Sequence, residues 1–339
     1  MPLFYAYLLF CHKYKSGGSL LAVEERNVHF MKEYVEIEGH KNGLFIESTD
    51  FDNPVLLFLH GGPGFPQYSI LKKSGLRWAD DFTVCYWEQR GTGMSYNSLT
   101  QGKVTLERLV SDTLVITNFL KKRFNKKKIY ICGHSWGTLL GSIVVSQYPE
   151  HYLAYIGVGQ FGRHFQSNKH TYEFLLETAI KRGEKWAEKD IRSVVFDIDF
   201  YKNRGYRRIL GRYLDKFGGG TKRTGYSNWQ GMKDFFTCNQ YSWEERFNIP
   251  KGIFFSYESL CETMAKADAA LLAPRFDVPV FIIHGVYDYQ TSYREAKRFY
   301  EKIEAPLKKF YTFENSAHSP FIEEQERFLE ILRTDVLRS

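Results

Sequence analysis

The sequence lacks an apolar run long enough to cross a membrane. Its apolar N-terminal stretch, MPLFYAYLLFC at residues 1–11, is about half as long as the ~20-residue stretch that a spanning helix needs. The stretch also lacks the basic start and the small-residue cleavage site of a secretion signal. We therefore expect no stable membrane span. We predict that residues 1–30 form a segment docked on the rest of the protein, with shallow membrane attachment as the weaker alternative.

The sequence is also poor in cysteine, and its five cysteines follow no spacing that would suggest disulfides or zinc. Cys85 and Cys132 lie within apolar runs, where a thiol packs as a small hydrophobic group. The histidines likewise lack the spacing of metal ligands. These absences argue against a disulfide-rich secreted protein and against a metalloenzyme. We predict a cytoplasmic protein without a metal or another cofactor.

Few prolines and no internal repeat argue against a disordered chain or a repeat array. With 10 prolines and 43% hydrophobic residues among 339, the composition is that of a globular protein with one large core or a core and a second lobe. The net charge is +7, but no nucleic-acid-reading motif accompanies it, and the basic run at residues 121–128 fits the solvated end of a helix. We expect no nucleic-acid partner, and the sequence leaves the oligomeric state open.

Short apolar runs alternate with longer helix-like stretches, a pattern typical of the α/β class with a mostly parallel central sheet flanked by helices. The predicted strands are a leading hairpin at residues 35–48, then 55–60, 82–87, 128–132, 155–159, a run from residue 278, and 308–313.

The strand pattern stops between residues 161 and 273, where aromatic and charged residues recur at helical spacing. Strand-like runs flank this stretch on both sides. We therefore predict a core formed by residues 31–160 and 274–339, with residues 161–273 inserted as a helical cap (lid). Insertions at the carboxyl edge of such sheets carry binding function, so the cap should cover the site.

The segment GHSWG, residues 133–137, follows a predicted strand and precedes a helix-like stretch. Gly-x-Ser-x-Gly at such a junction makes a sharp turn that raises the serine hydroxyl above the sheet, and Gly133 and Gly137 avoid collisions with neighbouring elements. In a simpler interpretation, Ser135 only caps the helix. The partners of Ser135 must decide between the two.

A serine nucleophile needs a histidine base, and the histidine needs an acid that orients it. On this scaffold the acid and then the histidine follow the serine in the chain. Asp288 lies on the loop after the run that starts at residue 278, and His318 lies on the loop after the last predicted strand. The rival acid Asp277 precedes its strand and so lies at the wrong edge of the sheet. We predict Ser135, Asp288 and His318 as a catalytic triad.

The oxyanion of a tetrahedral intermediate needs two backbone donors. The first predicted donor is the amide of Trp136, which starts the helix after the serine. The second should come from HGGPG at residues 60–64, where glycines let the backbone approach a carbonyl oxygen closely. We favour the amide of Gly62, with Gly61 as the second choice.

These segments resemble the proline iminopeptidase group of the α/β-hydrolases. HGGPG, WEQRGTGMS at residues 87–95, GHSWG and the two loops with Asp288 and His318 occur in that family's order and at similar spacing. The resemblance extends from about residue 35 to 324 and is weak across residues 161–273. It implies the α/β-hydrolase fold, the same triad, and an oxyanion hole of Gly62 and Trp136. Glu88 stands where the family usually has aspartate.

The family's aminopeptidases hold the free amine of the substrate with acidic side chains of the cap, one of them in an A-x-x-W-x-x-W-E stretch that this sequence lacks. The nearest match, YSWEERF at residues 241–247, makes Trp243, Glu244 and Glu245 candidate substrate-binding residues. Ser242 and Glu245 also fit a capping box at the start of a helix. That interpretation makes Glu245 structural and leaves Glu244 to face the cavity.

We predict a serine hydrolase that cleaves an ester or amide bond of a small molecule or short peptide through an acyl-enzyme, most like a proline iminopeptidase-type aminopeptidase. A carboxylesterase with an apolar acyl pocket is the alternative, and a non-catalytic binding protein on the same scaffold is a third. Dehalogenases and epoxide hydrolases place an aspartate at the turn, so Ser135 argues against both.

Overall fold

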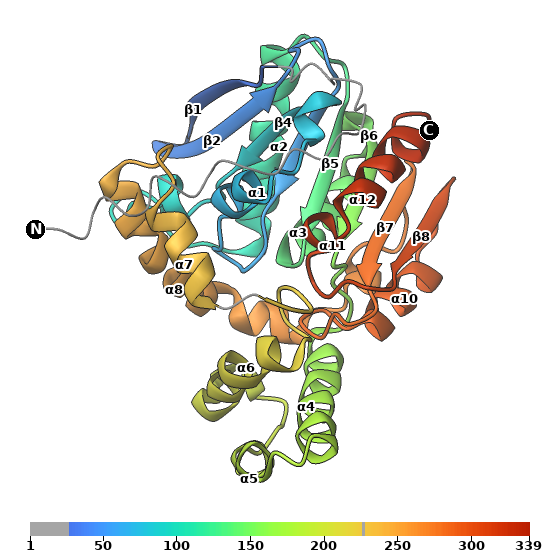
Figure 1. The fold of residues 1–339 in the computed structure, drawn as a ribbon. Helices are drawn as coiled ribbons and strands as arrows, with labels where there is room; N and C mark the ends of the chain where they lie inside the picture. The colour runs from blue at the N-terminus through green and yellow to red at the C-terminus, as the bar shows by residue number, and fades with distance from the viewer. Residues whose placement is uncertain (1–26, 226–227) are drawn as a thin grey trace, which may run out of the picture.

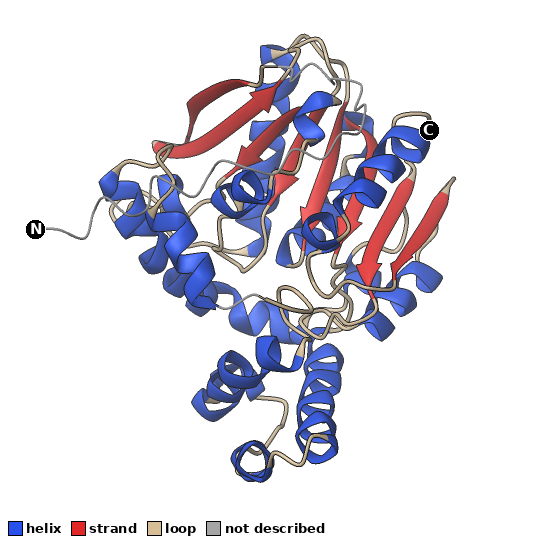
Figure 2. Ribbon diagram, viewed as in Figure 1, coloured by secondary structure: helices blue, strands red, loops and turns tan. Residues whose placement is uncertain are grey.

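The computed structural model describes residues 27–225 and 228–339, which contain an eight-stranded sheet in the order β1-β2-β4-β3-β5-β6-β7-β8 (Figures 1 and 2). The pairs β1/β2 and β2/β4 are antiparallel, and the other neighbours are parallel. The predicted α/β class with a mostly parallel sheet is confirmed. The strands are β1 (His29–Ile37), β2 (His40–Ser48), β3 (Val55–Leu59), β4 (Thr83–Trp87), β5 (Ile129–His134), β6 (Tyr152–Val158), β7 (Val280–Gly285) and β8 (Lys308–Phe313).

Helices cover both faces of this sheet. Alternate strand residues point to opposite sides, so each face presents apolar side chains that a helix can cover. Leu57 and Leu59 pack with α2 and α3 on one face, while Leu56 and Phe58 pack with α1 and α12 on the other. The helices are α1 (Tyr68–Ser74), α2 (Leu106–Arg123), α3 (Trp136–Gln147), α4 (His164–Lys181), α5 (Lys185–Arg192), α6 (Arg204–Phe217), α7 (Asn228–Phe236), α8 (Trp243–Lys266), α9 (Ala269–Leu272), α10 (Tyr293–Lys302), α11 (Pro320–Glu323) and α12 (Gln325–Ile331).

Every strand expected from the sequence is present, with ends that differ by a few residues. The leading hairpin is β1 and β2, whose turn at Glu38 and Gly39 uses positive φ angles. Of the segment predicted to dock at residues 1–30, residues 1–26 lie outside the described part of the chain, and His29 already belongs to β1. None of the described helices combines the length and apolar character that crossing a membrane requires. The predicted cytoplasmic location stays a prediction.

Helices α4 to α9 lie between β6 and β7, and no described residue between these two strands belongs to a named strand. Figure 1 shows α4, α5 and α6 extending from the end of the sheet at which the parallel strands terminate. These helices have an apolar core of their own, which includes Leu175, Ile191, Tyr206, Ile209 and Phe217. The cavities described below lie between these helices and the sheet.

Candidate active site

Ser135 occupies the turn between β5 and α3 with φ 55° and ψ −121°, a conformation that non-glycine residues rarely adopt. Two glycines make this turn possible. A Cβ on Gly133 would lie 2.3 Å from the carbonyl oxygen of Gly137, and a Cβ on Gly137 would lie 2.1 Å from the carbonyl oxygen of Leu59. The Ser135 side chain makes no capping hydrogen bond to α3. The simpler interpretation of this serine as a helix cap is therefore wrong.

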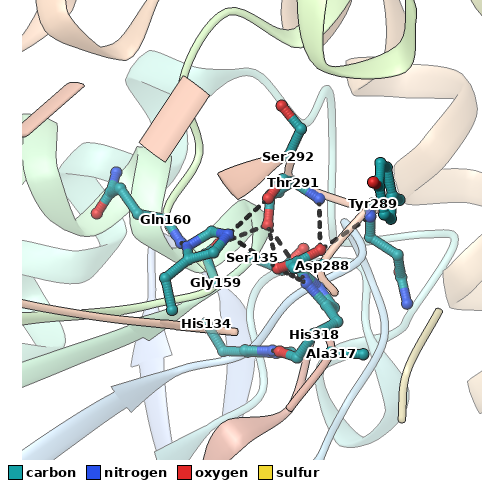
Figure 3. Close-up of polar contacts among 12 residues, drawn as sticks. His134, Ser135, Gly159, Gln160, Asp288, Tyr289, Thr291, Ser292, Ala317 and His318 are labelled. Atoms are coloured by element: carbon teal, nitrogen blue, oxygen red, sulfur yellow. Dashed lines mark hydrogen bonds and ion pairs between the residues drawn. The ribbon is translucent and has the colours of Figure 1, made fainter. Parts of the chain in front are cut away.

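Asp288 and His318 come together beside Ser135 (Figure 3). The Nδ1–H of His318 donates to Oδ2 of Asp288 at 2.8 Å, and both side chains are almost fully buried. This bond leaves Nε2 of the imidazole as the unprotonated nitrogen. Neither this nitrogen nor the Ser135 hydroxyl has a hydrogen-bond partner among the described residues, and His318 and Ser135 line the same cavity.

Asp288 receives hydrogen bonds on both carboxylate oxygens. Oδ1 accepts from the backbone amides of Gln290 at 2.8 Å and Thr291 at 2.9 Å. Oδ2 lies 2.9 Å from the Thr291 hydroxyl and 3.2 Å from Nε2 of His284. Burial alone would raise the pKa of Asp288, but electrostatic attraction to His318 and His284 and the hydrogen bonds with these two histidines hold the pKa well below its usual range. The carboxylate is therefore ionised and fixed in orientation.

His284, the penultimate residue of β7, supports Asp288 as a neutral side chain. The backbone amide of Gln160 donates to its Nδ1 at 3.0 Å, so Nδ1 carries no proton. The proton lies on Nε2, which donates to the carbonyl oxygen of Thr291 at 2.7 Å and faces Asp288. No pattern in the sequence predicts this role, because a histidine at the end of a buried strand carries no motif.

Gln67 connects three parts of the site through a chain of buried hydrogen bonds. Its Oε1 accepts from the amide of Gly61 at 3.0 Å, and its Nε2 donates to Nδ1 of His134 at 2.7 Å. The Nε2–H of His134 then donates to the carbonyl oxygen of His318 at 2.8 Å. Burial, followed by the charge of His318, lowers the pKa of His134 to about 3, so this histidine is neutral. This series of hydrogen bonds fixes the positions of the 60–64 loop, the serine turn and the His318 loop relative to one another.

These contacts distinguish the amides of the two residues predicted as donors in the 60–64 loop. The amide of Gly61, the second choice, is already bonded to Gln67. The amide of Gly62 has no partner among the described residues, and Gly62 adopts a φ of 115°, which favours glycine. The amide of Trp136 occupies the first position of α3, where the helix itself supplies no acceptor. Gly62 and Trp136 therefore remain the two amides available for an oxyanion.

Gln89, in the WEQRGTGMS segment, connects the 60–64 loop to Trp136 by hydrogen bonds. The indole Nε1–H of Trp136 donates to Oε1 of Gln89 at 3.0 Å. The Nε2 of Gln89 donates to the carbonyl oxygen of His60 at 3.0 Å, and its backbone amide donates to Nε2 of His60 at the same distance. Arg90, the next residue, forms a buried ion pair with Asp112 at 2.5 Å. This segment is therefore a structural support for the 60–64 loop.

Two cavities meet at Ser135. The larger cavity has a volume of about 620 Å³ and is lined, among others, by Gly62, Ser135, Phe65, Ile70, Asp215, Met232, Ile253, Phe254, His318 and Ile322. The smaller cavity has a volume of about 240 Å³ and is lined, among others, by Gly62, Ser135, Phe161, His164, Asn168, Phe200, Tyr206, Arg207 and Met264. Leu210, Leu214, Tyr257 and Gln290 line both, so the cavities adjoin beneath α6 and α8.

The structure does not bring Trp243, Glu244 and Glu245 to this site, which corrects the prediction made from YSWEERF. Glu245 completes the capping box with Ser242 and forms an ion pair with Lys32 at 2.6 Å. Glu244 lines a separate hollow beside the β1–β2 hairpin, and Trp243 is exposed at the start of α8. Glu245 is structural, as the alternative interpretation had it, but Glu244 faces neither cavity at Ser135.

The described residues contain no cluster of histidine, cysteine or carboxylate side chains that could hold a metal ion. Four cysteines, at positions 85, 132, 238 and 261, are free thiols. The arrangement provides an ionised acid, a histidine oriented by that acid, a strained serine turn and two free amides beside a cavity.

Comparison with known proteins places this arrangement in a family. A family model described as the alpha/beta hydrolase fold matches residues 54–197. The chain is 30% identical over 310 residues to the probable aminopeptidase YbaC of Bacillus subtilis strain 168, a match covering 91% of this chain and 96% of that protein. It is 25% identical over 287 residues to a proline iminopeptidase of Heyndrickxia coagulans, a match covering 82% and 88% of the two chains.

Solved structures support the same fold. The proline iminopeptidase of Mycobacterium smegmatis superposes with a TM-score of 0.63 at 15% identity, covering 89% of this chain and 96% of that one. The enol-lactonase of Burkholderia xenovorans LB400 superposes with a TM-score of 0.60 at 17% identity, covering 91% and 100%. The chain therefore belongs to the α/β-hydrolase family, among its proline iminopeptidase-like members.

Proposed function

We propose that the protein is a serine hydrolase that forms an acyl-enzyme on Ser135, with His318 as base and Asp288 as the acid that orients it. The observation that carries this proposal is the buried pair of His318 and Asp288 next to the strained turn of Ser135. Ser135, His318 and Asp288 come from distant parts of the sequence, and they are the three kinds of side chain that serine catalysis requires.

In the first step, the Ser135 oxygen attacks the substrate carbonyl while Nε2 of His318 takes the hydroxyl proton. Asp288 stays ionised and stabilises the imidazolium that forms. The amides of Gly62 and Trp136 donate to the oxyanion. His318 then protonates the leaving group, and a water molecule activated by the same nitrogen hydrolyses the acyl-enzyme. Catalytic hydrogen bonds commonly become short only in the substrate complex, so the unpartnered Ser135 hydroxyl is compatible with this route.

We further propose that the substrate carries a free amine at its N-terminus and that Asp215 binds it. Asp215 is the one carboxylate among the described residues that line the two cavities. Its Oδ1 accepts from the amide of Thr221 at 2.8 Å, and its Oδ2 has no described partner. The α-amine is bonded to the carbon beside the scissile carbonyl, so it would lie near the junction of the cavities, next to Leu214. The aminopeptidase names of the relatives support this substrate class.

A carboxylesterase is the second candidate, and the apolar lining of the larger cavity favours it. Phe65, Ile70, Ile253, Phe254 and Ile322 surround space that an alkyl or aryl group could fill without any amine contact. One carboxylate is also fewer than the paired acids that the family resemblance leads us to expect for an amine.

The test compares three substrates: proline p-nitroanilide, its N-acetylated form, and p-nitrophenyl butyrate. Ser135→Ala should reduce turnover of every cleaved substrate by at least about a thousandfold, because the nucleophile is lost. A fluorophosphonate should label Ser135 in the folded wild type. Wild-type rates in Ser135→Ala would overturn the acyl-enzyme proposal.

Asp215→Asn separates the two substrate classes. For an aminopeptidase, the variant should lower kcat/KM for proline p-nitroanilide by about ten- to a hundredfold, the cost of one charge-assisted contact, and leave the ester within about twofold. Glu244→Gln is the matched control and should change neither rate. Ester cleavage without any cleavage of the free-amine substrate would establish the carboxylesterase instead.

A further inference from the structure

The smaller cavity contains an unpartnered buried histidine. His164, the first residue of α4, stacks on Phe161 with ring centroids 4.9 Å apart and an interplanar angle of 10°. Its Nδ1 is one of three buried side-chain polar atoms without a hydrogen bond in the described chain, the others being the hydroxyls of Ser69 and Thr92. Because buried polar groups are nearly always paired, such an exception needs a physical reason.

The position of the ring gives that reason. Neither ring nitrogen of His164 has a protein partner, but the residue retains some accessible surface and lines the smaller cavity, whereas Nδ1 is inaccessible. An unpaired lone pair at Nδ1 costs less than an unpaired buried N–H, so the proton belongs on Nε2. Burial also lowers the pKa of His164 to about 4, which keeps the ring neutral. The ring therefore presents one N–H donor to the cavity.

The neighbours of His164 leave this donor without a competing acceptor. The amide side chain of Asn168 is already engaged, since its Nδ2 donates to the His164 carbonyl at 2.9 Å and its Oδ1 accepts from Tyr206 at 3.0 Å. Phe161, Phe200 and Met264 also line this cavity, together with polar residues that include Thr171, Arg207 and Gln290, and none of these accepts a hydrogen bond from the His164 ring. Since no described residue accepts from this donor, it is available to a group that enters the cavity.

The two cavities differ in whether His318 lines them. The leaving group must lie within reach of Nε2 of His318 to be protonated, and His318 lines the larger cavity but not the smaller one. The leaving group therefore belongs in the larger cavity, and the side chain of the acyl group belongs in the smaller one beside His164, with an α-amine at the junction of the two.

We propose that the smaller cavity is an acyl subsite for acyl groups that carry a hydrogen-bond-accepting oxygen, and that His164 Nε2–H donates to this oxygen. His164 is then a specificity-determining residue. The assignment of the cavity to the acyl side rests on the proposed acyl-enzyme at Ser135.

Equilibrium binding to Ser135→Ala tests this without turnover. The ligands are the anilide of hexanoic acid and the anilides of 3-, 4- and 5-oxohexanoic acid, measured by titration calorimetry. At least one oxo ligand should bind about three- to tenfold more tightly than the parent, the usual effect of one neutral hydrogen bond. Adding His164→Phe, which keeps the aromatic stack, should remove this preference and leave the parent within about twofold.

His170→Phe is the matched control, because His170 lies on the same helix but lines a different hollow. This variant should keep the preference. A second measurement needs no substitution at residue 164: the ¹⁵N resonance of His164 Nε2 should shift on addition of the preferred oxo ligand and not of the parent.

The proposal is overturned if no oxo ligand is preferred, if the preference survives His164→Phe, or if the His164 resonance does not respond. Failure of the proposed hydrolase function would look different. In that case the wild type would not turn over p-nitrophenyl hexanoate, whereas the binding preference would be unaffected.

Discussion

At the scale of single residues, the site depends on side chains that never touch the reacting atoms. Gln67 is 7% exposed, and its side chain bonds both Gly61 of the 60–64 loop and His134 of the serine turn. Its amide fits because Gly61 offers a donor and the Nδ1 of His134 is an acceptor. A side chain with only one of these capacities would break the chain of hydrogen bonds that ends at the His318 carbonyl.

Gln67→Leu should therefore lower kcat more than it changes KM. The buried Gly61 amide loses its acceptor, which costs about 1–3 kcal/mol of stability, and the adjacent Gly62 amide loses its fixed position. We expect kcat to fall by about tenfold, less than the ~10²- to 10³-fold effect of removing an oxyanion donor outright. The measurements are ester kinetics and guanidinium unfolding.

Gln101→Leu is the control for this prediction. Gln101 is also buried, and its Oε1 accepts from the amide of Asn97 at 3.2 Å, away from Ser135. It should lose stability without a change in kcat. If Gln67→Leu behaved in the same way, Gln67 would be a structural residue only.

The residues that carry motifs could be predicted from the sequence, and those that support them could not. Ser135, Asp288 and His318 follow a fixed order relative to strand ends, and Gly62 and Trp136 follow from the position of the serine. Gln67, His284 and His164 act through loops and helix ends whose approach depends on tertiary packing. Their spacing in the chain carries no signal.

At the scale of elements, the run of three glycines after α6 connects the inserted helices to both loops of the site. The carbonyl oxygen of Gly220 accepts from the His318 amide at 3.1 Å, and that of Gly219 accepts from the Tyr289 amide at 3.0 Å. A Cβ on Gly220 would lie 1.9 Å from Oδ1 of Asp215. The glycines therefore allow an approach that no side chain would permit.

Gly220→Ala should reduce activity through this contact. The new methyl group must displace either Asp215 or the glycine run, and both shifts move the carbonyl that holds the His318 backbone. We expect a fall of about tenfold in kcat on an ester that has no free amine, because a small misplacement of the base is costly. Steady-state kinetics and thermal unfolding check this. A lower Tm with wild-type kcat would show that the run supports packing alone.

The strands were predictable to within a few residues because buried strands are short apolar runs between polar turns. The inserted segment was predictable as helical, but not in its internal arrangement. The position of Glu244 shows why: the start of α8 is fixed by the ion pair of Glu245 with Lys32 of β1, a contact across more than 200 residues. No local pattern reports which face such a helix turns to the site.

At the scale of the whole molecule, a buried carboxyl group makes stability depend on pH. Glu88 is 2% exposed at the end of β4, where it accepts hydrogen bonds from the Tyr241 hydroxyl and from the Met94 amide at 2.6 Å. Burial raises its pKa to about 8, although these two hydrogen bonds and Lys32 act in the opposite direction and Glu245 adds to the increase. Glu88 links the sheet, the 93–95 turn and the loop before α8.

The free energy of unfolding should therefore fall as the pH rises from about 4.5 to 8. The unfolded chain loses the Glu88 proton near pH 4.3, whereas the folded protein keeps it until about pH 8, so the folded state binds more protons in this interval. The contribution is on the order of a few kcal/mol.

Glu88→Gln imitates the protonated acid, since its amide can donate to the Tyr241 oxygen and accept from the Met94 amide. Urea unfolding of both proteins between pH 5 and 9 should give curves that diverge with pH, the wild type becoming relatively less stable. Parallel curves would mean that Glu88 is already ionised in the folded protein at low pH, with Tyr241 and Met94 as sufficient partners for its charge.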